Sequence, residues 1–186
     1  MRAKALSQIK LCTPLKVKAV LLFMGCLPCF TAMLASSEFN GKPIKSLRTG
    51  IMAGSQCPEV LMRRVLYDLG CSEITIAYGM TETSPISFQS DVNDPVDIRV
   101  STVGRIQPHC EVKIVEDDGS TCAIGQTGEL WTKGYLVMKG YWNDTEATQS
   151  SIENGWMKTG DLATIDNEGF CRIVGRKKDM VIRGGE

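Results

Sequence analysis

The sequence has little of what several functional classes require. Its 21 basic and 21 acidic residues give a formal net charge of zero, so no net field attracts nucleic acid or an anionic membrane surface. Histidine occurs once, at His109, and no internal repeat or low-complexity tract is found. With 43% hydrophobic and 23% charged residues among 186, the composition is that of an ordinary soluble globular chain with no nucleic-acid partner.

The eight cysteines are scattered through apolar segments of a chain that is too long to need disulfide staples, so we expect reduced, structural thiols. Cys26 and Cys29 do form a C-x-x-C pair, which zinc or redox chemistry could use. No second pair stands at zinc spacing, and His109 is the single histidine. The sequence therefore favours a structural role for this pair over a metal or redox role.

The first 37 residues contain no acidic residue, and they include an apolar stretch over residues 19–35. Such a start can be an organelle-targeting segment, a secretory signal or an ordinary buried helix, and the last interpretation is favoured. Gly25 and Pro28 interrupt the apolar run, which is short for a membrane span, so no transmembrane span is predicted. We expect residues 1–27 to be a divergent N-terminal segment and the location to be mitochondrial or cytoplasmic.

Residues 47–78 show the pattern of a strand, a helix and a second strand. Residues 47–53 predict a short strand, Pro58 opens a helical stretch that Gly70 would cap, and residues 73–78 are rich in strand formers. This order builds a mostly parallel sheet, and loops at the ends of such strands are where ligands bind.

After a polar linker at residues 91–97, the pattern changes to short strands separated by turn residues, which predicts an antiparallel, barrel-like or sandwich-like region. The expected fold class is therefore α/β, a partial mostly parallel sheet with helices followed by a small antiparallel β-barrel-like region. The predicted strands are 112–115, 128–132, 162–165 and 170–174. The predicted domain bounds are 28–100, 101–175 and 176–186.

The first candidate site follows the strand at residues 73–78. Gly79 lets the backbone approach a ligand, Thr81 offers a hydroxyl and an N–H to a phosphate, and Glu82 can hold Mg²⁺ against that phosphate. The ring of Tyr78 offers a face to a nucleobase. Ordinary helix-capping chemistry accounts for the same residues about equally well.

Two later segments carry further polar candidates. Asp161, just before the strand expected at residues 162–165, could accept hydrogen bonds from both hydroxyls of a ribose, although a lone turn aspartate more often caps its own backbone. Arg176 begins a basic run after the last hairpin, where a guanidinium could reach ribose or phosphate oxygens. A charge run is more often a solvated surface.

Four motifs in this order strongly resemble the core motifs of the adenylate-forming (AMP-binding) superfamily of acyl-CoA synthetases, luciferases and peptide-synthetase adenylation domains. They are Y-G-M-T-E, G-E-L-W-T-K-G-Y-L-V-M-K-G-Y-W, K-T-G-D-L and G-R-K-K-D-M-V-I-R-G-G-E. The resemblance covers roughly residues 28–186. The sequence A-Y-G-M-T-E-T-S-P and that of the last motif are most similar to those of medium-chain fatty-acyl-CoA ligases of the acyl-CoA synthetase family member 2 type.

The resemblance assigns roles to the first motif. Tyr78 would pack on adenine, Thr81 would contact the phosphate and Glu82 would hold Mg²⁺, so that Thr81 and Glu82 are the expected catalytic residues. Gly79 and Met80 would complete the nucleotide-binding turn.

It assigns roles to the other motifs as well. Asp161 would bind the ribose hydroxyls, and Arg176 would bind the ribose or phosphate side. Ala53, Gly54 and Ser55 match a strand-end loop that lines the adenine and acyl pocket through its backbone. Asp179 matches the hinge about which a small C-terminal domain rotates between two catalytic states.

The resemblance implies an ATP-dependent acid:CoA ligase, with ATP and Mg²⁺ as cofactors and CoA as co-substrate. A carboxylic acid, expected to be a medium-chain fatty acid, attacks the α-phosphate of ATP, and the CoA thiol then displaces AMP. Catalysis of this kind is mostly positioning and electrostatic stabilisation, so it needs no nucleophilic side chain. Two alternatives stay open: a non-catalytic AMP- or ATP-binding module, and an adenylating enzyme with a non-CoA acceptor. No obligate protein partner is inferred.

Two parts that such enzymes need are missing. The phosphate loop rich in Gly, Ser and Thr is not found in residues 1–45, and the sequence stops at Glu186, before the domain that supplies a catalytic lysine. We therefore expect an incomplete chain that is weakly active or inactive by itself. Open sheet edges predict marginal solubility.

Overall fold

The computed structural model describes residues 22–177, which form two units. Unit 1 contains residues 22–76 and 91–100, and unit 2 contains residues 77–90 and 101–177. Most of the predicted N-terminal segment and the predicted hinge Asp179 lie outside the described residues. The domain bounds expected from the sequence stay a prediction.

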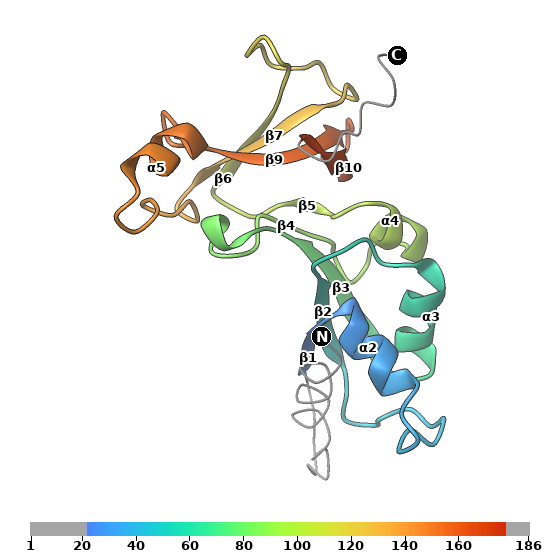
Figure 1. The fold of residues 1–186 in the computed structure, drawn as a ribbon. Coiled ribbons are helices and arrows are strands. Elements are labelled where there is room, and N and C mark those ends of the chain that lie inside the picture. Colours follow the sequence, from blue (N-terminus) through green and yellow to red (C-terminus); the bar gives the residue numbers. More distant parts are fainter. Residues whose placement is uncertain (1–21, 178–186) are drawn as a thin grey trace, which may run out of the picture. The chain divides into compact units, whose positions relative to one another are not determined.

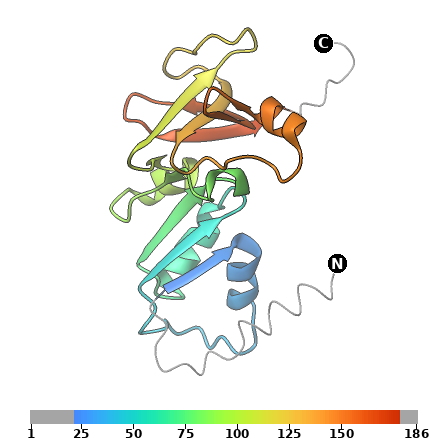
Figure 2. The same ribbon diagram turned by 90° about the vertical axis from the view of Figure 1, so that its left-hand side faces the viewer.

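Unit 1 is a parallel sheet with helices (Figures 1 and 2). Strand β2 (Thr49–Ala53) lies between β1 (Leu22–Cys26) and β3 (Glu73–Tyr78), and both pairings are parallel. The helices are α2 (Leu27–Leu34), α3 (Glu59–Tyr67) and α4 (Val96–Ser101). The predicted strand, helix and strand are thus confirmed, with β3 at its predicted bounds.

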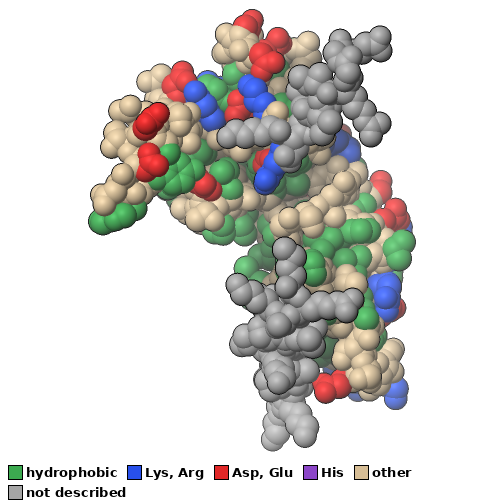
Figure 3. Space-filling model, in the orientation of Figure 1, with side chains coloured by type: hydrophobic (Ala, Val, Ile, Leu, Met, Phe, Trp, Pro, Cys, Tyr) green, Lys and Arg blue, Asp and Glu red, His purple; other side chains and the backbone are tan. Residues whose placement is uncertain are grey.

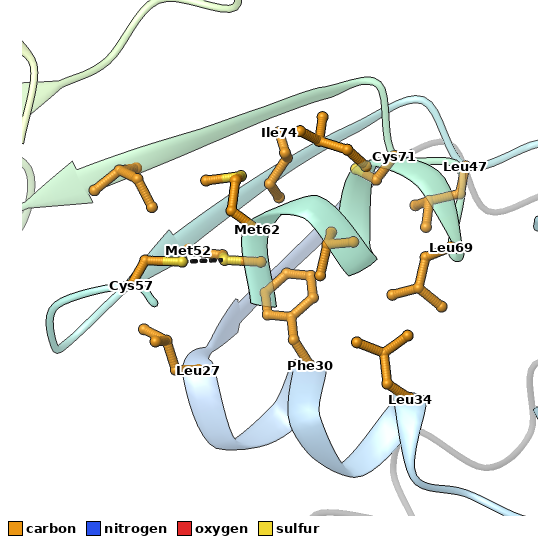
Figure 4. Close-up of a cluster of buried hydrophobic side chains, with 13 residues drawn as sticks. Leu27, Phe30, Leu34, Leu47, Met52, Cys57, Met62, Leu69, Cys71 and Ile74 are labelled. Carbon is orange, nitrogen blue, oxygen red and sulfur yellow. Dashed lines mark hydrogen bonds between the residues drawn. The ribbon is translucent and has the colours of Figure 1, made fainter. Parts of the chain in front are cut away.

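The core of unit 1 lies where both longer helices cover the sheet (Figure 4). Phe30 of α2 and Met62 of α3 are fully buried, as is Met52 of β2, whose sulfur accepts a hydrogen bond from the thiol of Cys57 at 3.5 Å. Methionine suits such a site because its flexible side chain fills irregular gaps.

Three sequence predictions for unit 1 need correction. The C-cap of α3 is Asp68, not Gly70; Gly70 takes the left-handed conformation two residues later, at φ +80°. The predicted linker at residues 91–97 runs into helix α4, whose buried Arg99 donates a hydrogen bond to the carbonyl of Ile74 at 2.8 Å. The apolar stretch is helical as favoured, but strand β1 precedes the helix. Within residues 22–177, no helix is both long enough and apolar enough to cross a membrane.

Unit 2 is antiparallel. The end of β3 pairs with β4 (Phe88–Gln89), which pairs with β5 (Arg105–Ile106). A second sheet has the order β10-β9-β7-β6 and curls as a half-barrel (Figure 1). Its strands are β6 (Cys110–Val115), β7 (Gly128–Gly134), β9 (Trp156–Ile165) and β10 (Cys171–Arg176), with β8 (Ile152–Glu153) paired to β9. The predicted α/β class with a β-barrel-like region is confirmed.

Two short helical elements of unit 2 were not predicted: the 3-10 turn η1 (Thr81–Thr83) and helix α5 (Thr145–Ser151). The side chain of Asp144 caps α5 by accepting from the N–H of Ala147. The core gathers around Phe88 and Leu130, both fully buried. On the face drawn in Figure 3, acidic and basic side chains are interspersed.

Candidate functional site

Tyr78, the last residue of β3, points its hydroxyl at a carboxylate that is far away in the sequence. The hydroxyl donates a hydrogen bond to Oδ2 of Asp161 at 2.5 Å. Burial, and then the neighbouring Asp161 carboxylate, raise the pKa of Tyr78, so the phenol stays protonated and keeps donating at physiological pH. The ring meets Phe88 edge to face, with centroids 6.1 Å apart, and this contact fixes its plane.

Asp161 lies inside β9, not just before a strand as the sequence suggested. The register between β7 and β9 shifts nearby, and Gly160 adopts a φ of +74°, so the strand bulges where Asp161 projects. The residue is 8% exposed. Its Oδ1 accepts from Nε of Arg176 at 3.0 Å. A carboxylate has about four lone-pair sites, so these two bonds leave capacity for two more donors.

Arg176 ends β10 directly opposite Asp161 in the strand register. Its side chain is 70% exposed although it pairs with a carboxylate that is mostly buried. The remaining guanidinium N–H groups therefore face solvent, where they can bind an anion such as a phosphate. The structure thus brings Tyr78, Asp161 and Arg176 into one hydrogen-bonded group.

The turn after Tyr78 is held by groups that the sequence analysis did not single out. Thr83 is fully buried, and its hydroxyl accepts from the N–H of Met80 at 3.2 Å and donates to the carbonyl of Met80 at 3.1 Å. Thr81, which was predicted to meet a phosphate, is exposed. Thr83 therefore shapes the turn and leaves Thr81 accessible.

Gly79 is required by packing. A Cβ on this residue would lie 1.7 Å from the carbonyl oxygen of Pro85, so a side chain cannot be accommodated without moving the backbone. From its position at a strand end, this glycine was expected to allow close approach of a ligand.

Glu82 is tied to the segment that follows β7. Its Oε1 accepts from the hydroxyl of Tyr141 at 2.8 Å, and its carbonyl accepts from the N–H of Met138 at 2.9 Å. Tyr141 was missed as a site residue, although it belongs to the G-Y-W end of the second motif. These contacts hold the Glu82 carboxylate in one place at the turn.

Glu129 of β7, the strand that pairs with β9, stabilises the bulge at Gly160. Glu129 was also missed as a site residue. Its Oε1 accepts from the N–H of Gly160 at 3.2 Å, and its Oε2 lies 3.4 Å from Nζ of Lys177. The Glu129 side chain is only 12% exposed. Because it anchors Gly160, it positions the backbone next to Asp161.

The remaining predicted residues belong to unit 1 or lie outside the described residues. Ala53 is the last residue of β2, and Gly54 and Ser55 follow it in unit 1; Gly54 has a φ of +94°, and a Cβ there would meet no atom within 4 Å. The Cα of Gly54 therefore faces open space. The predicted hinge residue Asp179 lies outside the described residues.

Comparison with known proteins identifies the class. The profile of the AMP-binding enzyme family matches residues 10–142, and the chain belongs to this family.

Individual relatives are acyl-CoA synthetases. The chain is 52% identical over 161 residues to a putative acyl-CoA synthetase, YngI, of Bacillus subtilis, and 42% identical over 159 residues to the mitochondrial medium-chain acyl-CoA ligase ACSF2 of Bos taurus. Each match covers 84% of this chain but only 29% and 26% of the relative. The chain therefore spans less than a third of the length of these relatives.

A solved structure shows the same fold. O-succinylbenzoate coenzyme A synthetase (MenE) of Bacillus subtilis, in complex with AMP, superimposes with a TM-score of 0.77 at 32% identity. The superposition covers 90% of this chain and 33% of that chain. The same enzyme has also been solved with ATP and magnesium ion.

Proposed function

We propose that this chain is the nucleotide-binding part of an ATP-dependent acid:CoA ligase that activates a carboxylic acid as its acyl-AMP. The observation that carries the proposal is the hydrogen-bonded group of Tyr78, Asp161 and Arg176, which joins β3, β9 and β10. A mostly buried carboxylate with free lone pairs, next to an exposed guanidinium, matches the ribose and phosphate of an adenylate. Membership of the AMP-binding family supports the same ligand.

In this proposal, each member of the group has its own role. Asp161 accepts hydrogen bonds from the ribose hydroxyls through the lone pairs that Tyr78 and Arg176 leave free. Arg176 donates to ribose or phosphate oxygens through its exposed N–H groups. Tyr78 presents its half-buried ring to adenine while its hydroxyl fixes the carboxylate.

The turn after β3 would meet the phosphates. Thr81 is exposed there and offers a hydroxyl. Glu82 fits a Mg²⁺ ion, because this ion is usually held by one or two carboxylates together with substrate phosphates and water. Among residues 22–177, no cluster of three His, Cys, Asp or Glu could form a full protein cage, which agrees with this mode of binding. When bound, Mg²⁺ neutralises phosphate charge.

The reaction follows from this placement. A carboxylate oxygen of the acid attacks the α-phosphorus, pyrophosphate leaves with the bonding electrons, and acyl-AMP forms. The CoA thiol then attacks the acyl carbon, and AMP leaves. We propose a medium-chain fatty acid as the substrate and a mitochondrial location, because the bovine relative ACSF2 is a mitochondrial medium-chain acyl-CoA ligase.

Isothermal titration with AMP and acid-dependent ATP–pyrophosphate exchange test the proposal on the 186-residue chain. We expect AMP binding that Asp161→Asn weakens about ten-fold, as loss of a charge-assisted hydrogen bond predicts. The matched control Asp118→Asn, on an exposed residue of the β6–β7 connection, should bind AMP like the wild type. Exchange should be weak, since the chain spans under a third of its relatives.

The outcomes separate the alternatives. AMP binding without any acid-dependent exchange favours a non-catalytic nucleotide module. Exchange with no thioester formed from CoA favours an adenylating enzyme with another acceptor. No AMP binding at all by the folded chain would overturn the proposal.

A further inference from the structure

Cys26 and Cys29 bring two thiols into contact at the start of a helix. Cys26 is the last residue of β1 and the N-cap of α2, and Cys29 lies in the first turn of α2 after Pro28. The two sulfur atoms are 3.2 Å apart. Cys26 is exposed and Cys29 is partly exposed, so solutes can reach the pair.

This geometry is close to that of a disulfide. A disulfide bond is about 2.05 Å long, so the sulfur atoms need to approach by only about 1.1 Å. Rotation of the two side chains can supply such a movement.

A metal role is less well supported. Zinc sites need about four ligands, and at least three from the protein. Among residues 22–177, no group of three His, Cys, Asp or Glu is placed to hold a metal ion. Two adjacent thiols are suited to redox chemistry instead.

Other thiols of the chain lie in different surroundings. Burial raises the pKa of Cys57 and of Cys71 to about 11, and that of Cys171 to about 12. Because the thiolate is the reactive form, these three thiols are poor nucleophiles at neutral pH. Cys26 is exposed and Cys29 partly exposed, so the pair differs from these three cysteines in its access to solvent.

We propose that Cys26 and Cys29 form a redox-active dithiol that closes to an intramolecular disulfide when it meets a low-molecular-weight disulfide such as oxidised glutathione. The more exposed Cys26 thiolate attacks one sulfur of the oxidant, which releases one glutathione thiolate and leaves a mixed disulfide. Cys29 then attacks the sulfur of Cys26 and releases the second glutathione. The protein loses two protons and two electrons, and the oxidant becomes two thiols.

The pair lies next to a loop that the sequence analysis marks as a ligand-binding segment. Cys26 is opposite Ala53 in the parallel register of β1 and β2, and Ala53 is followed by Gly54 and Ser55. Oxidation therefore acts at the strand end where this loop begins. The redox chemistry itself does not depend on nucleotide binding, so the two proposals fail separately.

The test is a titration of the reduced 186-residue chain with mixtures of oxidised and reduced glutathione, followed by acid quenching and alkylation of free thiols. The intact mass should show that the number of alkylated cysteines falls from eight to six in one step, with no glutathione attached to the chain. Tryptic cleavage after Lys18 and Lys45 isolates both cysteines in one peptide, which should then carry an internal disulfide.

Variants and denaturant provide the controls. Cys29→Ser should stop at the mixed disulfide on Cys26, and Cys110→Ser should leave the midpoint of the two-thiol loss unchanged. In urea, half-oxidation of the pair should require a ratio of oxidised to reduced glutathione about ten-fold higher, because the fold no longer holds the two thiols together. The proposal is wrong if Cys26 and Cys29 oxidise independently to separate mixed disulfides, or if urea does not shift the midpoint.

Discussion

Replacing Tyr78 with phenylalanine removes one oxygen atom and measures how firmly Asp161 is held. The lost hydrogen bond spans 2.5 Å and ends on a carboxylate of a residue that is 8% exposed. Hydrogen bonds to charged groups contribute about 1.5–3 kcal/mol, and one oxygen of the Asp161 carboxylate would lose its donor. Because Arg176 still pairs with the other oxygen, we expect a loss of about 2 kcal/mol in the free energy of unfolding.

Urea unfolding followed by tryptophan fluorescence measures this loss. The three tryptophans, Trp131, Trp142 and Trp156, all belong to unit 2, so the fluorescence reports on the unit that contains the site. For a chain of this size, the same change lowers Tm by about 4–8 °C. Tyr135→Phe is the matched control, since Tyr135 is 76% exposed in the same unit. If Tyr78→Phe differs from this control by less than about 0.5 kcal/mol, the bond to Asp161 does not stabilise the fold as argued.

Three further predictions follow from the same contacts. Because the pKa of Tyr78 is raised in the folded chain, the stabilisation by the Tyr78 hydroxyl is complete below about pH 10 and is lost as the pH rises further. The difference in unfolding free energy between wild type and Tyr78→Phe should therefore shrink from about pH 10 to about pH 12 in urea titrations, and a constant difference would contradict this. Tyr141→Phe should raise the Kd of MgATP about three-fold and leave that of AMP unchanged by calorimetry, because Tyr141 orients the Glu82 carboxylate; an equal change for both ligands would argue against a metal role. Gly79→Ala should destabilise unit 2 by about 3 kcal/mol because of the clash with the Pro85 carbonyl, while Gly175→Ala, with open space around it, should cost under about 1 kcal/mol; equal urea midpoints would refute the packing argument.

Local pattern predicted the regular elements well. Strand β3 has its predicted bounds because a β-rich run ends at a glycine, and helix α3 follows Pro58, whose ring cannot continue a preceding helix. Helices α4 and α5 were missed because each is short and depends on contacts that a pattern does not show. For α4 this is the buried bond of Arg99 to Ile74, and for α5 it is the Asp144 cap.

The site was only partly predictable. Motif resemblance singled out Tyr78, Asp161 and Arg176, but their pairing crosses 83 and 15 sequence positions and depends on strand register, which local sequence does not determine. Thr83 and Tyr141 were missed because a hydroxyl in a polar segment carries no sign of whether it is buried or bonded. Their positions follow from the turn and the loop, which form only in the folded chain.

The most direct test of the nucleotide site combines one change in the protein with one change in the ligand. Calorimetry would compare AMP with 2′,3′-dideoxy-AMP, on wild type and on Asp161→Asn. If Asp161 binds the ribose hydroxyls, the substitution should raise the Kd of AMP about ten-fold and that of the dideoxy ligand by less than about two-fold. Equal losses for both ligands would contradict the central claim, because Asp161 would then act on something other than the ribose.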